Sequence, residues 1–148
     1  MRLDSEPLMM TALSRTSVLE RQSEIATFLF EHLGEFGDPL DQIQSCLTYV
    51  TSRGGQVFIA EQDDQLIGAV VINDTGMGGY IPEHILVYIA VDGRMRGKGI
   101  GKALMEEAIL KTPGDIALHV EPHNPARRLY ERLGFESKYL EMRFSQLK

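Results

Sequence analysis

The chain has 148 residues, a formal net charge of −6, 43% apolar residues and 24% charged residues. This length suits one domain with a proper hydrophobic core, so we expect a single domain over residues 1–148. The acidic balance argues against a general nucleic-acid binder. Solubility accounts for the acidic excess, and a preference for a cationic substrate is the alternative.

The sequence favours a cytoplasmic protein. Its longest apolar runs are too short to span a bilayer, and residues 1–7 lack the basic-then-apolar order of a signal peptide. The single cysteine, Cys46, excludes an internal disulfide framework and gives no metal-ligand cluster, so we expect no membrane association and no metal. Cys46 lies beside the apolar face of an expected helix, and without a paired histidine it is best interpreted as a buried thiol.

The N-terminal part predicts one strand and two helices. A short apolar stretch from Leu8 to Leu13 suits a first strand. The sequence Ser17-Val18-Leu19-Glu20 has the spacing of a capping box and predicts a helix from about Ser17 to His32. Asp38 as N-cap and Pro39 as first helical residue predict a second helix, which Gly54-Gly55 end.

From Gln56 onward the pattern changes to strands. Val57–Glu61 and Leu66–Ile72 flank a polar turn and predict an antiparallel hairpin. The second arm is apolar on both faces, as a central strand covered on both sides should be. The glycine-rich segment 76–82 that follows either shapes a binding site or simply links two strands.

The stretch from Leu86 to Leu110 carries the clearest functional signal. It predicts an apolar strand over Leu86–Val91, a turn at Asp92-Gly93 and a helix from about Gly99 to Lys111. Glycines at alternate positions near the helix start bring the backbone close to a ligand, and the first N–H groups of a helix are unpaired. The basic residues here, with no acid between them, are Arg94, Arg96, Lys98 and Lys102. Such a place binds a phosphate or pyrophosphate.

Two familiar phosphate-binding motifs do not fit this stretch. A dinucleotide fingerprint needs a third glycine where the chain has Lys102 or Leu104, depending on the starting glycine. A P-loop needs serine or threonine where the chain has Gly99. A nucleotide-binding regulator is therefore disfavoured.

The C-terminal part predicts a second strand–helix unit. Ile116–Glu121 reads as a fifth strand with His119 on one face, and Asn124-Pro125 caps a short helix that Gly134 ends. One or two final strands are expected from Phe135 and the alternating Leu140, Met142 and Phe144. The whole pattern indicates a mixed α+β domain.

The run Arg96-Gly97-Lys98-Gly99-Ile100-Gly101 after an apolar strand resembles the acyl-coenzyme A signature of the GNAT (Gcn5-related N-acetyltransferase) family. Asn124 and the segment Ala126–Phe135, with its Leu-Tyr-Glu-Arg-Leu-Gly-Phe sequence, resemble the later motifs of that family in the right order. The resemblance covers nearly the whole chain and is strongest from Val87 to Phe135. It implies an α/β fold with a mostly antiparallel central sheet of about six or seven strands flanked by about four helices.

The resemblance implies direct transfer of an acetyl group from acetyl-CoA to an amine. We expect a small cytoplasmic amine, with a protein amine as the alternative, and a homodimer is one option for the oligomeric state. Backbone N–H groups from Arg96 to Lys102 would hold the pyrophosphate. Arg127 would touch the phosphates of the coenzyme, although a solvated helix face explains Arg127 equally well. The coenzyme contacts implied are Ile89, Ala90, Val91, Arg96, Gly97, Lys98, Gly99, Ile100, Gly101, Lys102, Asn124, Arg127 and Tyr130.

The resemblance also implies catalytic roles. The backbone N–H near Val91 would donate to the oxyanion, and Tyr130 would protonate the departing thiolate or hydrogen-bond to it. His119 stands where some members carry a basic glutamate. Glu83 and Glu121 are alternatives, and the enzyme could also work without a single base.

Two alternatives stay open at this point. Counting back from Tyr130 places His123, rather than Asn124, in the role of the family asparagine, whereas counting forward from Val120 supports Asn124. The second alternative is a non-catalytic acyl-CoA sensor that keeps the fold and regulates a partner. Tyr130 and the intact glycine turn favour the enzyme, because a sensor needs no acid for a thiolate.

Overall fold

A computed structural model of the chain describes residues 7–146. The chain divides between Leu118 and His119 into two compact units, and each is described by itself. Within residues 7–146, no helix is long and apolar enough to cross a membrane.

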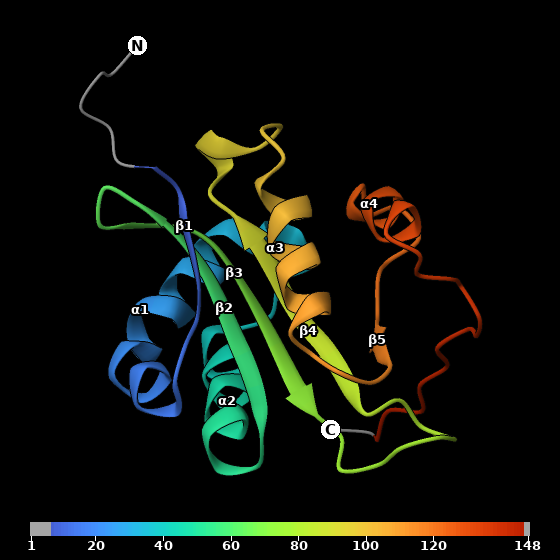
Figure 1. The fold of residues 1–148 in the computed structure, drawn as a ribbon. Helices are drawn as coiled ribbons and strands as arrows, with labels where there is room; N and C mark the ends of the chain where they lie inside the picture. Colours follow the sequence, from blue (N-terminus) through green and yellow to red (C-terminus); the bar gives the residue numbers. More distant parts are fainter. Residues whose placement is uncertain (1–6, 147–148) are drawn as a thin grey trace. The chain divides into compact units, whose positions relative to one another are not determined.

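The first unit is built on one mixed sheet with the strand order β1-β2-β3-β4-β5. Neighbouring strands from β1 to β4 are antiparallel, and only β4 and β5 are parallel (Figure 1). This arrangement confirms the mixed fold class. The strands are β1 (Met9–Ala12), β2 (Gly55–Gln62), β3 (Gln65–Asp74), β4 (His84–Val91) and β5 (Ile116–Leu118).

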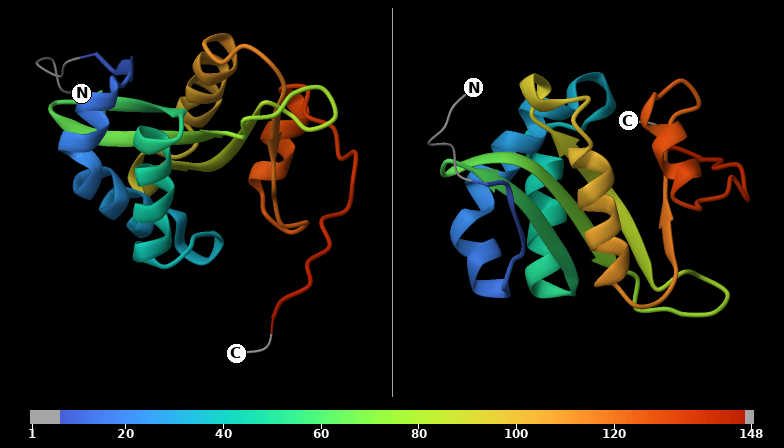
Figure 2. Two further views of the ribbon diagram at one scale, coloured as in Figure 1. Left: turned by 90° about the horizontal axis from the view of Figure 1, so that it is seen from below. Right: turned by 45° about the horizontal axis from the view of Figure 1, so that its top comes forward.

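The helices of this unit cover both faces of the sheet. Figure 2 shows α1 and α2 on one face and α3 on the other. Two short 3₁₀ turns, η1 and η2, lie in the connections that follow α1 and β4. The bounds are α1 (Arg15–Leu33), η1 (Gly34–Phe36), α2 (Leu40–Ser52), η2 (Gly93–Met95) and α3 (Ile100–Leu110).

Strand β3 is the centre of the core. Every residue from Leu66 to Ile72 is buried, because helices cover the strand on both sides. Helix α3 approaches so closely that a Cβ placed on Gly68 would lie 2.6 Å from a methyl carbon of Leu104. The expectation of a central strand, apolar on both faces, is confirmed.

Both helix starts differ from the expectation by a few residues. Ser14, not Ser17, is the N-cap of α1, and its hydroxyl accepts a hydrogen bond from the Ser17 N–H at 3.1 Å. Asp38 does not cap α2, because Pro39 occupies the N-cap position and no side chain caps the helix. The Asp38 carboxylate instead accepts a hydrogen bond from the Tyr88 hydroxyl.

Two strand predictions at the C-terminal side were wrong. The fifth strand ends at Leu118 rather than Glu121, because β5 pairs only with the first three residues of β4. The final strands expected from Phe135, Leu140, Met142 and Phe144 do not form among the described residues, where 136–146 are irregular. Alternating polarity favours a strand, but a strand also needs a neighbour with which to pair.

In the described part of the second unit, residues 119–146, there is one helix, α4 (Ala126–Arg132). Pro125 occupies the N-cap position, and Asn124 Oδ1 accepts a hydrogen bond at 2.9 Å from the N–H of Ala126, the first residue of the helix. At the other end Gly134 adopts a φ of 104°, its N–H bonds to the Glu131 carbonyl, and the Phe135 N–H bonds to the Tyr130 carbonyl. These two bonds form a Schellman motif and confirm Gly134 as the helix terminator.

Candidate functional site

Strand β4 leaves part of one edge open. It pairs with β3 along its length, but with β5 only over His84–Leu86. The pairing with β3 passes from Val71–Tyr88 to Ile72–Leu86, so Val87 is an extra residue, a β-bulge, at the point where β5 leaves. Within the described part of the first unit, residues 87–91 therefore have no strand partner on that side. An extended ligand with amide groups can pair with such an edge.

A buried carboxylate fixes the turn that follows this edge. Asp92 is 4% exposed, and its side chain caps η2 by accepting the Arg94 N–H at 2.9 Å. The Arg94 guanidinium donates to both carboxylate oxygens of Asp92. These hydrogen bonds from Arg94 lower the pKa of Asp92 from its ordinary 3.8 to about 2. The turn is thereby held at the end of β4.

The glycines after the turn leave an open space above the backbone. Gly97 and Gly99 both have a φ of +80°, and a Cβ placed on either would find no atom within 4 Å. The first hydrogen bond of α3 joins the Ala103 N–H to the Gly99 carbonyl at 3.1 Å. The backbone N–H groups of residues 97–102 have no protein acceptor among residues 7–146. A row of N–H donors at a helix start under open space can bind an anion.

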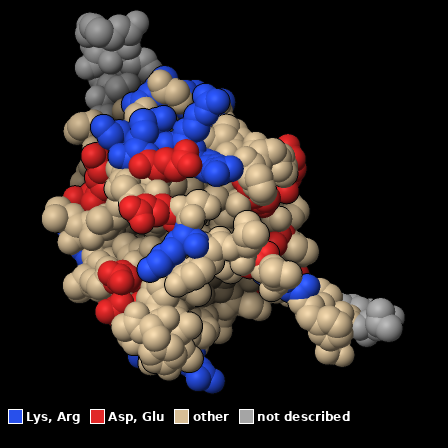
Figure 3. Space-filling model, turned by 90° about the vertical axis from the view of Figure 1, so that its right-hand side faces the viewer, with Lys and Arg blue, Asp and Glu red and all other residues tan. Residues whose placement is uncertain are grey.

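The four basic side chains from Arg94 to Lys102 differ in their contacts. The Arg94 side chain binds Asp92, and the Arg96 guanidinium donates to the Val91 and His32 carbonyls. Lys98 and Lys102 have no ion pair with a carboxylate among the described residues. Figure 3 shows Lys and Arg side chains toward the top of one face of the molecule. Of the four side chains, only that of Arg94 is paired with a carboxylate, and Arg96 differs from the two lysines in being held by carbonyl groups.

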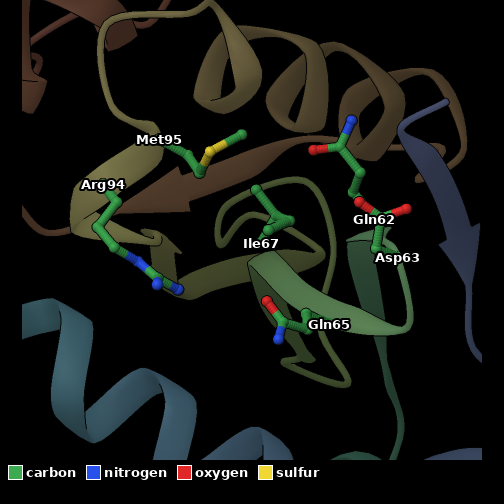
Figure 4. Close-up of a pocket in the computed structure, with 6 residues that line it drawn as sticks. All are labelled: Gln62, Asp63, Gln65, Ile67, Arg94 and Met95. Atoms are coloured by element: carbon green, nitrogen blue, oxygen red, sulfur yellow. The ribbon is translucent and has the colours of Figure 1, made fainter. Parts of the chain in front are cut away.

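A small pocket lies beside η2, under the turn between β2 and β3. Its volume is about 250 Å³, below the roughly 300–1,000 Å³ of a typical small-molecule site. Figure 4 shows the side chains around it, which come from the hairpin and from η2. They are Gln62, Asp63, Gln65, Ile67, Arg94 and Met95.

Tyr130 is the most buried of the predicted site residues in the second unit. It lies on α4 and is 7% exposed, with its ring edge-on to Phe135 at 6.1 Å between centroids. Burial, and then the charge of Glu121, raise the pKa of Tyr130 to about 12. The phenol is therefore protonated at neutral pH and can donate a hydrogen bond.

The other predicted residues of the second unit have structural contacts. Asn124 accepts a hydrogen bond from the Ala126 N–H and donates from Nδ2 to Glu121 at 3.2 Å. Arg127 pairs with Glu131 one helical turn away, at 3.5 Å. His119 is exposed and lies just past the end of β5, not within a strand as expected.

The structure shows the contacts of two further candidate residues of the first unit, Glu83 and Cys46. The Glu83 carboxylate accepts the Asp115 N–H at 3.1 Å, and this bond lowers the pKa of Glu83 below its ordinary value. Cys46 is buried, and burial raises the pKa of its thiol to about 12, which agrees with the expectation of an inert thiol.

The first unit brings together Ile89, Ala90, Val91 and the segment from Arg96 to Lys102, because β4 runs directly into the turn and α3. Sequence reasoning missed two contributors to this region. Asp92 was treated only as part of a turn, and the hydrogen bond between Asp38 and Tyr88 joins residues 50 positions apart, so no local pattern indicates it.

The family model described as an acetyltransferase (GNAT) domain matches residues 53–137, which is more than half of the chain. The match includes the open edge of β4, the glycine turn, α3 and α4. The chain therefore belongs to the GNAT acetyltransferase family. No curated protein matches the sequence.

Solved structures with the same fold include several acetyltransferases. One is the aminoglycoside N-acetyltransferase AAC(6')-Iy in complex with CoA, at 19% identity and a TM-score of 0.68, covering 95% of each chain. Another is the aminoglycoside acetyltransferase meta-AAC0020 from an uncultured soil metagenomic sample, in complex with sisomicin, at 18% identity and 0.65, covering 95% of this chain and 97% of that one.

A third similar structure is the ribosomal-protein-alanine N-acetyltransferase from Brucella melitensis biovar Abortus 2308. Its identity is 21% and its TM-score 0.63, with 95% of this chain and 100% of that chain covered. At these identities the likeness establishes the fold.

Proposed function

We propose that the protein transfers an acetyl group from acetyl-CoA to a primary amine of a small molecule. The observation that carries this proposal is the open edge of β4 leading directly into the unpaired N–H groups above Gly97 and Gly99. An extended amide chain that ends in a pyrophosphate matches both features in the same order along the backbone.

The residues present fit coenzyme A. The backbone of Val87–Val91 would pair with the pantetheine arm, and the N–H groups of residues 97–102 would hold the pyrophosphate. A Cβ on Gly97 or Gly99 would stand in the space that the phosphates need. Lys98 and Lys102 supply charge, whereas the Arg96 side chain already binds two carbonyls, so Arg96 would contribute through its backbone.

When bound, acetyl-CoA would supply an activated acetyl group: the amine nitrogen would bond to the acetyl carbon and give up a proton to the base, and the carbon–sulfur bond would break to release a thiolate that takes up a proton from water. The chain contributes the Val91 N–H as a fixed donor to the developing oxyanion. Such a dipole costs no reorganisation during the reaction, because the strand already holds it in place.

Tyr130 would stabilise the departing sulfur by donating a hydrogen bond. Its pKa of about 12 lies well above the ordinary thiol value of about 8.5, so a complete proton transfer from Tyr130 to the sulfur is unfavourable at equilibrium. The burial that raises this pKa also keeps the phenol protonated and ready to donate.

His119 is the proposed base and would act through water. Its side chain is exposed, and it lies past the end of β5 rather than within a strand. Glu83 is less suited, because it is bound to the Asp115 N–H and has a lowered pKa. Asn124 and Arg127 would also contact the coenzyme. Asn124 would do so in addition to its hydrogen bond with the Ala126 N–H, and Arg127 in addition to its ion pair with Glu131.

A small-molecule amine is favoured because two similar structures are aminoglycoside acetyltransferases. A protein amine is the alternative, since a third is a ribosomal-protein-alanine N-acetyltransferase. The cytoplasm is the expected compartment, because a single buried thiol suits a reducing environment.

A thiol-release assay with acetyl-CoA and a panel of small amines tests this function. We expect release that depends on an added amine, and we expect Tyr130→Phe to lower kcat by about 10- to 100-fold with little change in acetyl-CoA affinity. An unchanged rate would remove Tyr130 from the chemistry. Tight acetyl-CoA binding without release on any amine would favour the sensor instead.

A further inference from the structure

The last turn of α1 and the connection to α2 are hydrogen-bonded to the strand that carries the proposed reaction centre and to the turn after it. The His32 ring accepts the Gly93 N–H at 3.2 Å, and the His32 carbonyl accepts a hydrogen bond from Arg96. Asp38, at the other end of the connection, accepts the Tyr88 hydroxyl. Residues 32–38 therefore lie along β4 from Tyr88 to the turn beyond Val91, and the right-hand view of Figure 2 shows this connection beside that turn.

The Asp38–Tyr88 pair has an exposed side and a buried side. Tyr88 is 7% exposed and packs in the core under α1 and α2, whereas Asp38 is exposed. Burial, together with the hydrogen bond to Asp38, raises the pKa of Tyr88 above its ordinary value, so the phenol stays a donor. A buried donor thus orients an exposed carboxylate that does not cap its helix.

The location of this carboxylate matches the expected direction of the acceptor. The phosphates would lie at the start of α3, which covers one face of the sheet. Tyr88 points to the other face, where α1 and α2 pack. Because the amine must reach the acetyl carbon from a side that the coenzyme does not fill, the acceptor would approach past the α1–α2 connection.

Asp38 has no basic neighbour along the chain, and the cation recorded on this segment, Arg96, is bonded to the His32 carbonyl six residues away. The 31 residues from Gln22 to Ser52 contain no lysine or arginine. A primary amine must lose its proton before it attacks, and it then loses its attraction to a carboxylate. Only an acceptor with another cationic group keeps that attraction in the reactive state.

We propose that Asp38, oriented by Tyr88, binds a second cationic nitrogen of the acceptor and so selects amines that carry at least two positive charges. This inference rests on the proposed function, because it places the acceptor against β4. Asp38 is a specificity-determining residue here, and Tyr88 is a positioning residue that acts through it.

Calorimetric titration of the coenzyme A-saturated protein tests the proposal, with 1,4-diaminobutane as the dication and n-butylamine as the matched monocation. We expect the dication to bind and Asp38→Asn to weaken it about tenfold or more, as for other hydrogen bonds between charged groups. Asp38→Glu should recover part of the affinity. Tyr88→Phe should give an intermediate loss, because the carboxylate stays but is no longer oriented.

Asp41→Asn is the matched control, since it removes the same charge from an exposed aspartate three residues along the chain. Its effect should be less than twofold. Equal losses in Asp38→Asn and Asp41→Asn, equal binding of the two amines, or no dication binding by the coenzyme-saturated protein would overturn the proposal. Failure of coenzyme A itself to bind in the first step of the titration would instead overturn the proposed function.

Discussion

Asp92 illustrates how a single buried side chain can hold the functional turn. It caps η2 and accepts three hydrogen bonds from Arg94, and these bonds hold its pKa near 2. We expect Asp92→Ala to lower the free energy of unfolding by about 1–2 kcal/mol at pH 7, as for the loss of other caps. Urea unfolding of both proteins measures this difference.

The same substitution should show a defined pH dependence. The pKa of Asp92 is lower in the folded state than the ordinary 3.8, so its contribution to stability is complete above about pH 4 and is lost as the pH falls toward 2. The gap in unfolding free energy between wild type and Asp92→Ala should therefore shrink between pH 5 and pH 2.5. A gap that stays constant over this range would contradict the assigned ionic role.

At the scale of elements, the start of α1 shows which of two serines, Ser14 or Ser17, caps the helix. Ser17-x-x-Glu20 has the capping-box pattern, but in the structure Ser14 lies one turn earlier and caps the helix. We expect Ser14→Ala to lower the unfolding free energy by about 1 kcal/mol and Ser17→Ala by much less, in urea titrations of the two variants. A larger loss for Ser17→Ala would restore the capping-box assignment.

Elements whose signals are local could be predicted from the sequence. Gly134 ends α4, with its own N–H bonded to the Glu131 carbonyl and the Phe135 N–H bonded to the Tyr130 carbonyl, and β3 is apolar along its whole buried length. The end of β5 could not be predicted, because it depends on where β4 bulges at Val87 on a different strand. The prediction of final strands was wrong for the same reason. Alternating polarity can be seen in the local sequence, but the presence of a neighbouring strand with which to pair cannot.

At the scale of the whole molecule, the candidate site also combines features that the local sequence predicts with features that depend on the fold. The glycine turn was predictable because Gly97 and Gly99 are adjacent to the helix that they open. The open edge of β4 requires the topology of the sheet, and the Asp38–Tyr88 pair requires two elements 50 residues apart in sequence. The glycine turn proposed to hold the pyrophosphate is therefore predictable from the local sequence, whereas the open strand edge and the proposed acceptor contact depend on the tertiary structure.

Coenzyme A is proposed to bind at the turn between β4 and α3, and titration calorimetry with acetyl-CoA measures this binding. Gly99→Glu would place a side chain and a negative charge among the N–H groups of residues 97–102. Gly79→Glu is the matched control, because Gly79 has a φ of +78° against +80° for Gly99, with no atom near either Cβ.

We expect wild type and Gly79→Glu to bind acetyl-CoA with similar affinity and Gly99→Glu to show no measurable binding. Because backbone strain and added charge are the same in both variants, the comparison isolates the location of the site. Binding by Gly99→Glu at wild-type affinity, or an equal loss in both variants, would contradict the account.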